Sequence, residues 1–225
     1  MMYRYSSFFI SVAIFIGIFF TASAQPKAAK PATNNDPEAE KYLKSIRLKL
    51  QSIVGYKLNF ETVITDADQK KQSFKGSYFG SKEKFEMDMP DHKTINDGKT
   101  QWVVNKKEKE INISKYIKPK KSKTETPIEI IMNYSTLFKY RVKEPLRNQV
   151  VILELIPINK NTSFFKVDLT LNIAKNQIVH AKLYDKGGHR IEFIFTNMME
   201  LTKLPTSSFI INLSDYKGYE ILDMR

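Results

Sequence analysis

The chain contains no cysteine among its 225 residues. Disulfide bonds, thiolate metal sites and cysteine nucleophiles are therefore excluded, and the fold has to be stabilised by its apolar core. A domain of about 200 residues can bury enough apolar surface for this. The absence of cysteine also means that the chain cannot itself carry a lipid on an N-terminal cysteine.

The sequence also lacks the motifs of the common enzyme classes. It has no G-x-S-x-G elbow, no H-E-x-x-H motif, no P-loop and no glycine-rich dinucleotide fingerprint. Only three histidines are present, and His180 and His189 lie on either side of the turn signal Gly187-Gly188. With Asp185 they could form a two-histidine metal site, but paired surface histidines near a hairpin are the simpler interpretation. We expect no catalytic residue, no cofactor and no metal.

The first 24 residues have the features of a secretory signal peptide. Arg4 supplies positive charge, residues 8–20 form an apolar run too short to cross a bilayer comfortably, and Ala22-Ser23-Ala24 is typical of a cleavage site. An uncleaved N-terminal anchor is the alternative. We expect cleavage after Ala24, export to the periplasm, and a flexible leader rich in Pro, Ala and Asn over residues 25–35.

Positive charge is in excess, with 36 Lys and Arg against 24 Asp and Glu and a net charge of +12. In the cytoplasm such an excess would indicate nucleic acid, but the predicted export argues against that partner. Phospholipid surfaces, acidic protein patches and a merely hydrated surface remain as alternatives. One predicted loop is especially basic and is either a docking patch or an uncommitted loop; its lysines are Lys115, Lys118, Lys120, Lys121 and Lys123.

Two segments carry helix signals. The first begins at Asp36-Pro37, where aspartate can cap free N–H groups and proline fits the first helical position, and it stops before Gly55. The second spans Pro127–Leu137 and begins with a capping box, Thr126 to Glu129. Both have an apolar side suited to covering a sheet: Ala39, Leu43, Ile46, Leu50 and Ile53 in the first, and Ile128, Ile131, Met132 and Leu137 in the second.

The rest of the chain reads as strands. Phe85, Met87 and Met89 alternate with acidic residues and so share one face, and Asp97-Gly98 suits a type I′ hairpin turn that leads back through Trp102. Strands at this spacing predict an all-β, up-and-down sheet or open barrel in a single domain, residues 36–225. The predicted strands are 56–64, 72–78, 85–89, 100–104, 110–113, 139–143, 149–156, 163–173, 178–185, 190–198, 209–213 and 219–222.

Several short motifs follow one another in a distinctive order. They are Tyr56-Lys57-Leu58-Asn59-Phe60, Asp97-Gly98-Lys99-Thr100-Gln101-Trp102, Glu110-Ile111-Asn112-Ile113, Thr126-Pro127, Phe165-Lys166-Val167-Asp168-Leu169 and Gly218-Tyr219-Glu220-Ile221. In this order they resemble the LolA-type outer-membrane lipoprotein carriers, over essentially the whole mature chain. The hairpin motif D-G-K-T-x-W is the most specific part of the resemblance.

The resemblance implies an incomplete antiparallel β-barrel, or half-barrel, with two or three helices that form a lid. It also implies a monomeric periplasmic chaperone with no nucleic-acid partner. Such a protein takes acylated lipoproteins from an inner-membrane exporter complex to an outer-membrane receptor or to the membrane itself. The alternatives are a carrier of a free lipid or other amphiphile in the same half-barrel, and a regulator that senses lipoproteins.

A carrier of acyl chains needs an apolar cavity, and adaptable Met and aromatic side chains suit it. The expected cavity residues are Leu58, Phe60, Tyr78, Phe85, Met87, Met89, Trp102, Ile131 and Met132; the alternative is that they form an ordinary core. Members of the family often have an Arg-Pro pair before the hairpin, whose Arg holds the lid closed. Here that stretch reads Ser81-Lys82-Glu83-Lys84, so Lys82 is the expected lid latch, without the forked donors of arginine.

Overall fold

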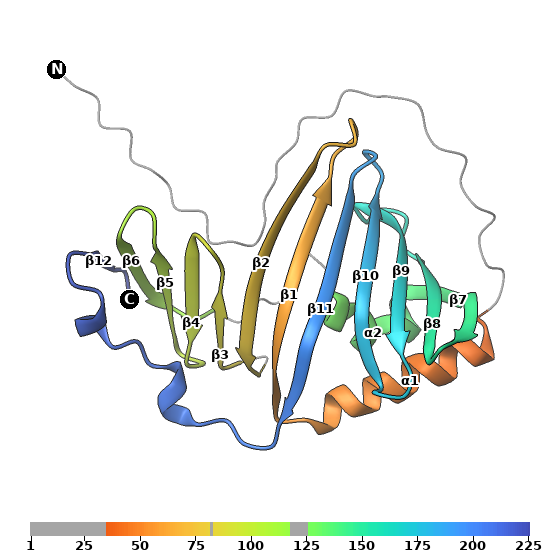
Figure 1. Cartoon of the computed structure of the whole chain (residues 1–225), viewed down its shortest axis with the longest axis horizontal. Coiled ribbons are helices and arrows are strands. Elements are labelled where there is room, and N and C mark those ends of the chain that lie inside the picture. Colours follow the sequence, from red (N-terminus) through yellow and green to blue (C-terminus); the bar gives the residue numbers. More distant parts are fainter. Residues whose placement is uncertain (1–34, 82, 118–125) are drawn as a thin grey trace.

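The computed structural model describes residues 35–81, 83–117 and 126–225. The predicted signal peptide, the predicted leader up to residue 34, Lys82 and residues 118–125 lie outside these ranges. The described part contains one twelve-stranded sheet and two α-helices (Figure 1). The elements are α1 (Pro37–Ser52), β1 (Gly55–Thr65), β2 (Lys71–Gly80), β3 (Phe85–Asp88), β4 (His92–Asn96), β5 (Thr100–Asn105), β6 (Glu110–Lys115), α2 (Pro127–Leu137), β7 (Phe138–Arg147), β8 (Val150–Pro157), β9 (Phe164–Asn172), β10 (Gln177–Asp185), β11 (Arg190–Leu201) and β12 (Glu220–Asp223).

The sheet consists of two antiparallel meanders joined side by side. Its order is β12-β6-β5-β4-β3-β2-β1-β11-β10-β9-β8-β7, and β1 joins the meanders by pairing with β11 from Gly55↔Leu201 to Thr65↔Arg190. The two ends of the sheet do not pair with each other, which confirms the predicted mainly-β half-barrel with helices. One pairing departs from the antiparallel prediction, because β12 runs parallel to β6.

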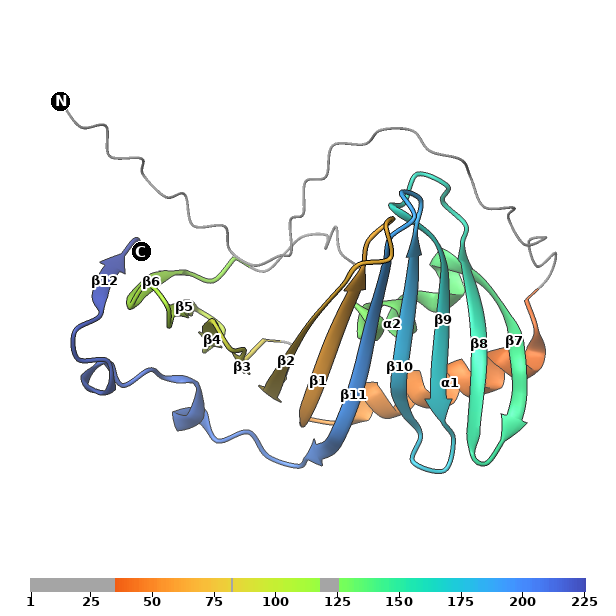
Figure 2. The same cartoon turned by 45° about the horizontal axis from the view of Figure 1, so that its top comes forward.

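The two helices cover the same face of the β7–β11 half of the sheet, which we call the helix-side face (Figure 2). Both predicted helix starts are confirmed. Asp36 Oδ1 accepts from the N–H groups of Glu38 and Ala39, and Thr126 and Glu129 make both bonds of the capping box. The buried core beneath the helices comprises Ala39, Leu43, Ile46, Ile130, Ile131, Tyr134, Phe138, Tyr140, Val151, Leu153, Leu155, Phe164, Val167, Leu169, Leu171, Ile178, Ala181 and Leu183.

Helix α2 is rotated relative to the prediction. Its buried residues are Pro127, Ile130, Ile131 and Tyr134, whereas Leu137 at its end is 41% exposed. The ring of Tyr134 meets Tyr140 of β7 edge-on, with 5.2 Å between centroids. An aromatic ring buries more apolar surface than a leucine does, so this contact determines which side of the helix faces the sheet.

A second core lies on the opposite face, which we call the outer face. It contains Ile95, Trp102, Val104, Ile111 and Ile113 of β4–β6, together with Phe209 and Ile211 of the C-terminal segment. This segment forms 3₁₀ turns at Thr206–Phe209 and Leu213–Asp215, so the strand predicted over 209–213 is wrong. Phe209 and Ile211 are buried and Ile210 is exposed, which imitates a strand pattern, but they pack on a sheet face instead of pairing at an edge.

The Asp97-Gly98 turn forms at the predicted residues, but it joins β5 to β4, a strand that was not predicted, and it is not type I′. Gly98 has a positive φ of 92°, whereas Asp97 has not, and type I′ requires both. Side-chain oxygens stabilise the turn instead: Asn96 Oδ1 accepts from Gly98 N at 2.7 Å, and Asp97 Oδ1 accepts from Thr100 N at 2.7 Å. The prediction failed because Asx side chains compete with the pure backbone turn.

The outer face of the second meander is charged instead of apolar. Glu154 of β8 and Asp168 of β9 are buried, and each pairs with a basic side chain of β7. Arg141 Nη2 lies 2.6 Å from Glu154 Oε1, and Lys143 Nζ lies 2.8 Å from Asp168 Oδ2. The apolar side chains of these strands are therefore concentrated on the helix-side face.

Asp36 joins α1 to the edge of the sheet. Its Oδ1 caps the helix, while its Oδ2 accepts from the N–H of Val142 on β7 at 3.0 Å. The backbone N–H of Asp36 in turn donates to the Tyr140 carbonyl at 3.1 Å. The bond from Val142 holds the pKa of the Asp36 carboxyl below its ordinary value of 3.8.

We expect Asp36→Ala to lower the free energy of unfolding by about 1 kcal/mol at pH 7. Because the folded pKa lies below the unfolded one, this contribution is present above about pH 4 and is lost as the pH falls through the folded pKa. Urea unfolding at several pH values measures it, with Lys41→Ala as the control on the same helix. An equal loss at pH 7 and at pH 2 would contradict the carboxylate's role.

Candidate functional site

The register of the central strands shows which side chains point to the helix-side face. Directly opposed residues of antiparallel strands share a face, and successive residues alternate. Phe195 of β11 packs against the helix-covered core and is opposed to Phe60 of β1. Leu58 is opposed to Tyr78 of β2, and Tyr78 to Met87 of β3. These side chains therefore continue the helix-side face across the middle of the sheet.

A continuous set of half-buried apolar residues lies on this part of the helix-side face. It borders the core under α1 and α2, because Ile191, Phe193 and Phe195 pack against that core. Unlike the core, none of its members is completely buried. We call it the apolar strip; its residues are Phe60, Ile64, Phe74, Tyr78, Phe85, Met87, Ile191, Phe193 and Phe195.

Aromatic stacking orders one end of the strip. The Tyr78 ring lies between Tyr56, at a centroid distance of 5.0 Å, and Phe85, at 5.7 Å. The Tyr78 hydroxyl donates to the Ser81 carbonyl. Burial raises the pKa of Tyr56 to about 12 and raises the pKa of Tyr78 as well, so both phenols stay neutral. The strip is thus an uncharged surface, which suits a hydrocarbon ligand.

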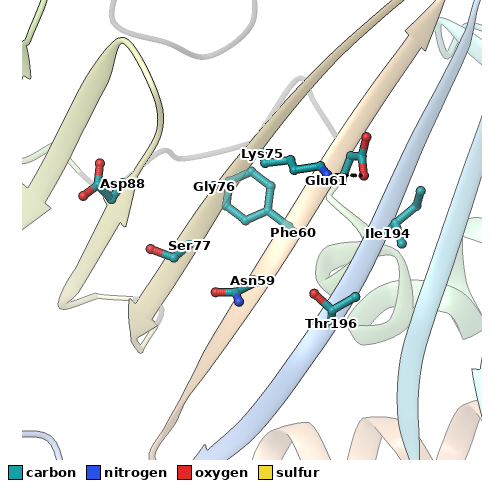
Figure 3. A pocket seen from close by; sticks show the side chains of 9 residues that line it. All are labelled: Asn59, Phe60, Glu61, Lys75, Gly76, Ser77, Asp88, Ile194 and Thr196. Carbon is teal, nitrogen blue, oxygen red and sulfur yellow. Dashed lines mark ion pairs between the residues drawn. The ribbon is translucent and has the colours of Figure 1, made fainter.

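An open pocket of about 500 Å³ lies where β3 separates from β2 (Figure 3). Most of its lining side chains belong by register to the outer face, but Phe60 of the apolar strip also lines it. The Phe60 ring lies against Gly76, where an added Cβ would be 2.6 Å from Phe60 Cζ and 2.7 Å from the Asp88 carbonyl oxygen. Glycine is therefore required for Phe60 to lie across β2. The lining residues are Asn59, Phe60, Glu61, Lys75, Gly76, Ser77, Asp88, Ile194 and Thr196.

The structure brings together some of the residues predicted to line a cavity. Phe60, Tyr78, Phe85 and Met87 lie in the apolar strip, with Leu58 buried beside them. The other three predicted residues near this face are placed differently. Ile131 is fully buried in the core under α2, Met132 is half-buried on the same helix, and Met89 lies just beyond the end of β3.

Trp102 is not brought together with these residues. It is opposed to Ile95 of β4 and Ile113 of β6, and it belongs to the outer-face core with Phe209. Adjacent residues of a strand face opposite sides, so the neighbouring Val103 points to the helix-side face and Trp102 points away from it. Sequence reasoning treated a large aromatic as a ligand-facing residue without establishing its phase relative to β3.

Sequence reasoning also missed five members of the strip: Ile64, Phe74, Ile191, Phe193 and Phe195. The signal was present, because Ile191, Phe193 and Phe195 are large apolar residues at alternate positions of one strand. Lys115 is exposed at the end of β6, whereas Lys82, Lys118, Lys120, Lys121 and Lys123 lie outside the described residues.

The two histidines that were considered for a metal site, His180 and His189, contact different carboxylates. His180 Nε2 lies 3.1 Å from Glu192 Oε2, and His189 Nδ1 lies 3.5 Å from Asp185 Oδ1. Within the described ranges, no group of three or more His, Asp and Glu side chains is arranged to hold a metal ion. In the same part of the chain, neither helix has the length and apolar character needed to cross a bilayer.

Comparison with known proteins gives one family and several structures of similar fold. The model of the family described as outer membrane lipoprotein carrier protein LolA matches residues 51–212. A LolA superfamily protein of Nitrosomonas europaea shares 12% identity over 77% of this chain and 97% of its own, with a TM-score of 0.38. LprF of Mycobacterium bovis shares 9% identity over 76% of this chain and 98% of its own, with a TM-score of 0.47. Comparison with curated proteins gives no match.

The placement of the single tryptophan gives a direct test of the site. We expect acyl chains labelled with bromine, a contact quencher, to leave Trp102 fluorescence unchanged on binding, because Trp102 points to the outer face. In the matched variant, Trp102→Phe combined with Phe60→Trp, the same chains should quench the fluorescence. Quenching of Trp102 without quenching at position 60 would place the ligand on the outer face.

Proposed function

The chain belongs to the family of LolA, the outer membrane lipoprotein carrier proteins, and on this basis we propose that it is a periplasmic chaperone for acylated lipoproteins. It binds lipoproteins released from the inner membrane and delivers them to the outer membrane. Members of this family are carriers and not enzymes. The observation that carries the proposal is the apolar strip, a neutral and incompletely buried surface beside a helix-covered core.

In the proposed complex, acyl chains lie along the apolar strip. Phe60, Phe74 and Met87 offer flat or flexible side chains that adapt to a mobile hydrocarbon. The chains shield surface that is half-exposed in the free protein, and Phe193 and Phe195 connect this surface to the core under the helices. The charged outer face of the second meander has no comparable apolar surface, so binding is confined to one side of the sheet.

The free energy gained by burying acyl chains limits how completely the ligand can be enclosed. One chain of 16 carbons contributes roughly 12 kcal/mol at about 0.8 kcal/mol per methylene, and three chains would contribute roughly 36. Non-covalent affinities reach a ceiling at roughly 18 to 21 kcal/mol. A carrier that also releases its cargo must therefore leave part of the lipid exposed or use part of the gain to move its helices.

Moving the helices is costly in this protein. The space beneath them is filled by side chains such as Ile130, Ile131 and Tyr134, each at most 1% exposed. We propose that the first acyl chain uses the strip as it stands. Further chains then require α2 to shift, which exposes these side chains and lowers the net affinity to a value that permits release.

The proposal includes the predicted partners. The monomeric carrier exchanges cargo with an inner-membrane exporter complex and with an outer-membrane receptor or membrane. Lys82 as lid latch, and the lysines from Lys115 to Lys123 as a docking patch for acidic surfaces, remain part of it. So do cleavage after Ala24 and the single carrier domain over residues 36–225.

A carrier of free lipid would use the same strip, since the strip contacts only hydrocarbon. Native mass spectrometry of the protein purified from its own periplasm separates the two functions. Adducts with the mass of acylated polypeptides support the lipoprotein carrier. Adducts of small lipids alone would favour the other function.

Placing a negative charge in the apolar strip tests the site. We expect Met87→Asp and Ile64→Asp each to remove two or three methylenes from contact, which weakens binding of a diacylated lipopeptide by about 2 kcal/mol, or roughly thirtyfold. Val63→Asp is the matched control, because Val63 adjoins Ile64, is also half-buried, and points to the outer face. Fluorescence titration measures the affinities, and circular dichroism verifies the fold of each variant. Equal losses in Val63→Asp and Ile64→Asp would show that the strip does not hold the lipid.

A further inference from the structure

Strand β2 has an edge that no described strand covers. On one side it pairs with β1 along its whole length, from Lys71↔Thr65 to Gly80↔Tyr56. On the other side it pairs with β3 only from Ser77 to Gly80. Residues 71–76 therefore have one side without a strand partner among the described residues. We call these six residues the free edge.

The free edge can form a further ladder of hydrogen bonds. In a strand, the N–H and C=O groups of alternate residues point to opposite sides, so half of those in residues 71–76 point away from β1. Lys71, Gln72, Ser73 and Lys75 are exposed, and the edge is open to solvent. Six residues in a strand span roughly 20 Å, which is enough to pair with a short extended peptide.

The outer edges of the sheet are covered or blunted, in contrast to the free edge. On β7, Asp36 bonds to the backbone of both Tyr140 and Val142, and Pro145 removes a donor further along. At the other end of the sheet the outermost strand, β12, is only four residues long, and it carries a carboxylate at each end, Glu220 and Asp223, so it offers little edge for pairing. Lysine on an exposed edge also discourages association, and Lys71 and Lys75 leave that explanation open for β2.

The C-terminal end of the free edge lies at the pocket and beside the apolar strip. Gly76, its last residue, lines the pocket together with Ser77 and Asp88. Phe60 lines the same pocket and lies in the strip, so a molecule seated on the strip can continue along β2 (Figure 3).

Charge favours an acidic peptide at this edge. Lys75 has 75% of its side chain exposed and is 3.7 Å from Glu61, a long contact that leaves its ammonium group accessible. Lys71 is exposed as well, and it forms no ion pair with any other described residue. Both lysines point to the outer face by register, where they would flank acidic side chains of an added strand.

We propose that the free edge binds, as an added β-strand, the extended polypeptide that follows the acylated N-terminus of a cargo lipoprotein. This inference rests on the proposed function, because the acyl chains on the strip deliver the peptide to the edge. Strand addition uses backbone hydrogen bonds, which are independent of sequence, so one carrier can accept many cargoes. The lysines add a preference for acidic residues near the lipid.

The test uses diacylated lipopeptides with one eight-residue sequence rich in Thr and Glu. N-methylation of alternate residues removes the N–H groups on one side of the peptide. We expect methylation on the side that faces β2 to weaken binding at least tenfold, because the N–H groups that would donate to β2 are lost. Methylation of the other set of residues is the matched control and should leave the affinity unchanged.

A cross-linking experiment locates the peptide on the protein. Because the natural chain has no cysteine, Ser73→Cys introduces a single thiol on the free edge. A lipopeptide with one free thiol, first activated as its mixed disulfide with thionitrobenzoate, should form a disulfide with this variant and release thionitrobenzoate. It should not do so with Glu144→Cys, which places a thiol at an exposed position of the β7 edge.

The outcomes separate this inference from the proposed function. If all lipopeptides bind equally and cross-link equally at both positions, strand addition is overturned while the carrier function stands. If none of them binds, and a diacylated cysteine without peptide does not bind either, the proposed function fails. If Ser73→Cys instead forms a disulfide-linked dimer that lipopeptide does not displace, a second copy of this chain occupies the edge and the inference is overturned.

Discussion

The strict alternation of side chains along the strands of one continuous sheet is the constraint on which the rest of the structure depends. Since directly opposed residues share a face, the strand pairing places the side chains from Phe195 across to Met87 on the same face of the sheet. The helix-side face becomes apolar throughout the second meander and the centre of the sheet. The outer face carries a buried apolar core where the C-terminal segment covers β4–β6. A shift of one residue in any strand would exchange these faces, so the apolar strip and the two cores are determined together.

The two helices cover only part of this apolar face, and the proposed carrier function depends on that incompleteness. Over β7–β10 the core is closed, with residues such as Leu153 and Leu169 fully buried. Over β1–β3 and β11 the apolar side chains remain half-buried, so a hydrocarbon chain can take the place of a missing cover. The affinity of such a surface is limited because the ligand is only partly enclosed. Limited affinity is a requirement for a carrier that must also release its cargo.

Local signals in the sequence predicted the helices and most of the strands, because these signals act within a few residues, but they did not predict β4. The capping groups Asp36 and Thr126 determine where the helices begin, and both helices were located correctly. The half-barrel followed from strand spacing and from resemblance to a family. The wrong predictions required information about distant segments. Trp102 has the same local appearance on either face, and only its pairing with Ile95 and Ile113 assigns it to the outer core. Likewise, residues 209–213 alternate as a strand does, but their partner is the face of β4–β6, which no local pattern shows.

The central claim is that acyl chains occupy the helix-side face and not the outer face. A lipopeptide whose acyl chain carries a photoactivatable diazirine tests it most directly, when the cross-linked residues are identified by mass spectrometry. We expect cross-links to Phe60, Phe74, Met87, Phe193 and Phe195, and none to Trp102 or Phe209. Cross-links concentrated on Trp102 and Phe209 would contradict it, because they would place the lipid beneath the C-terminal segment.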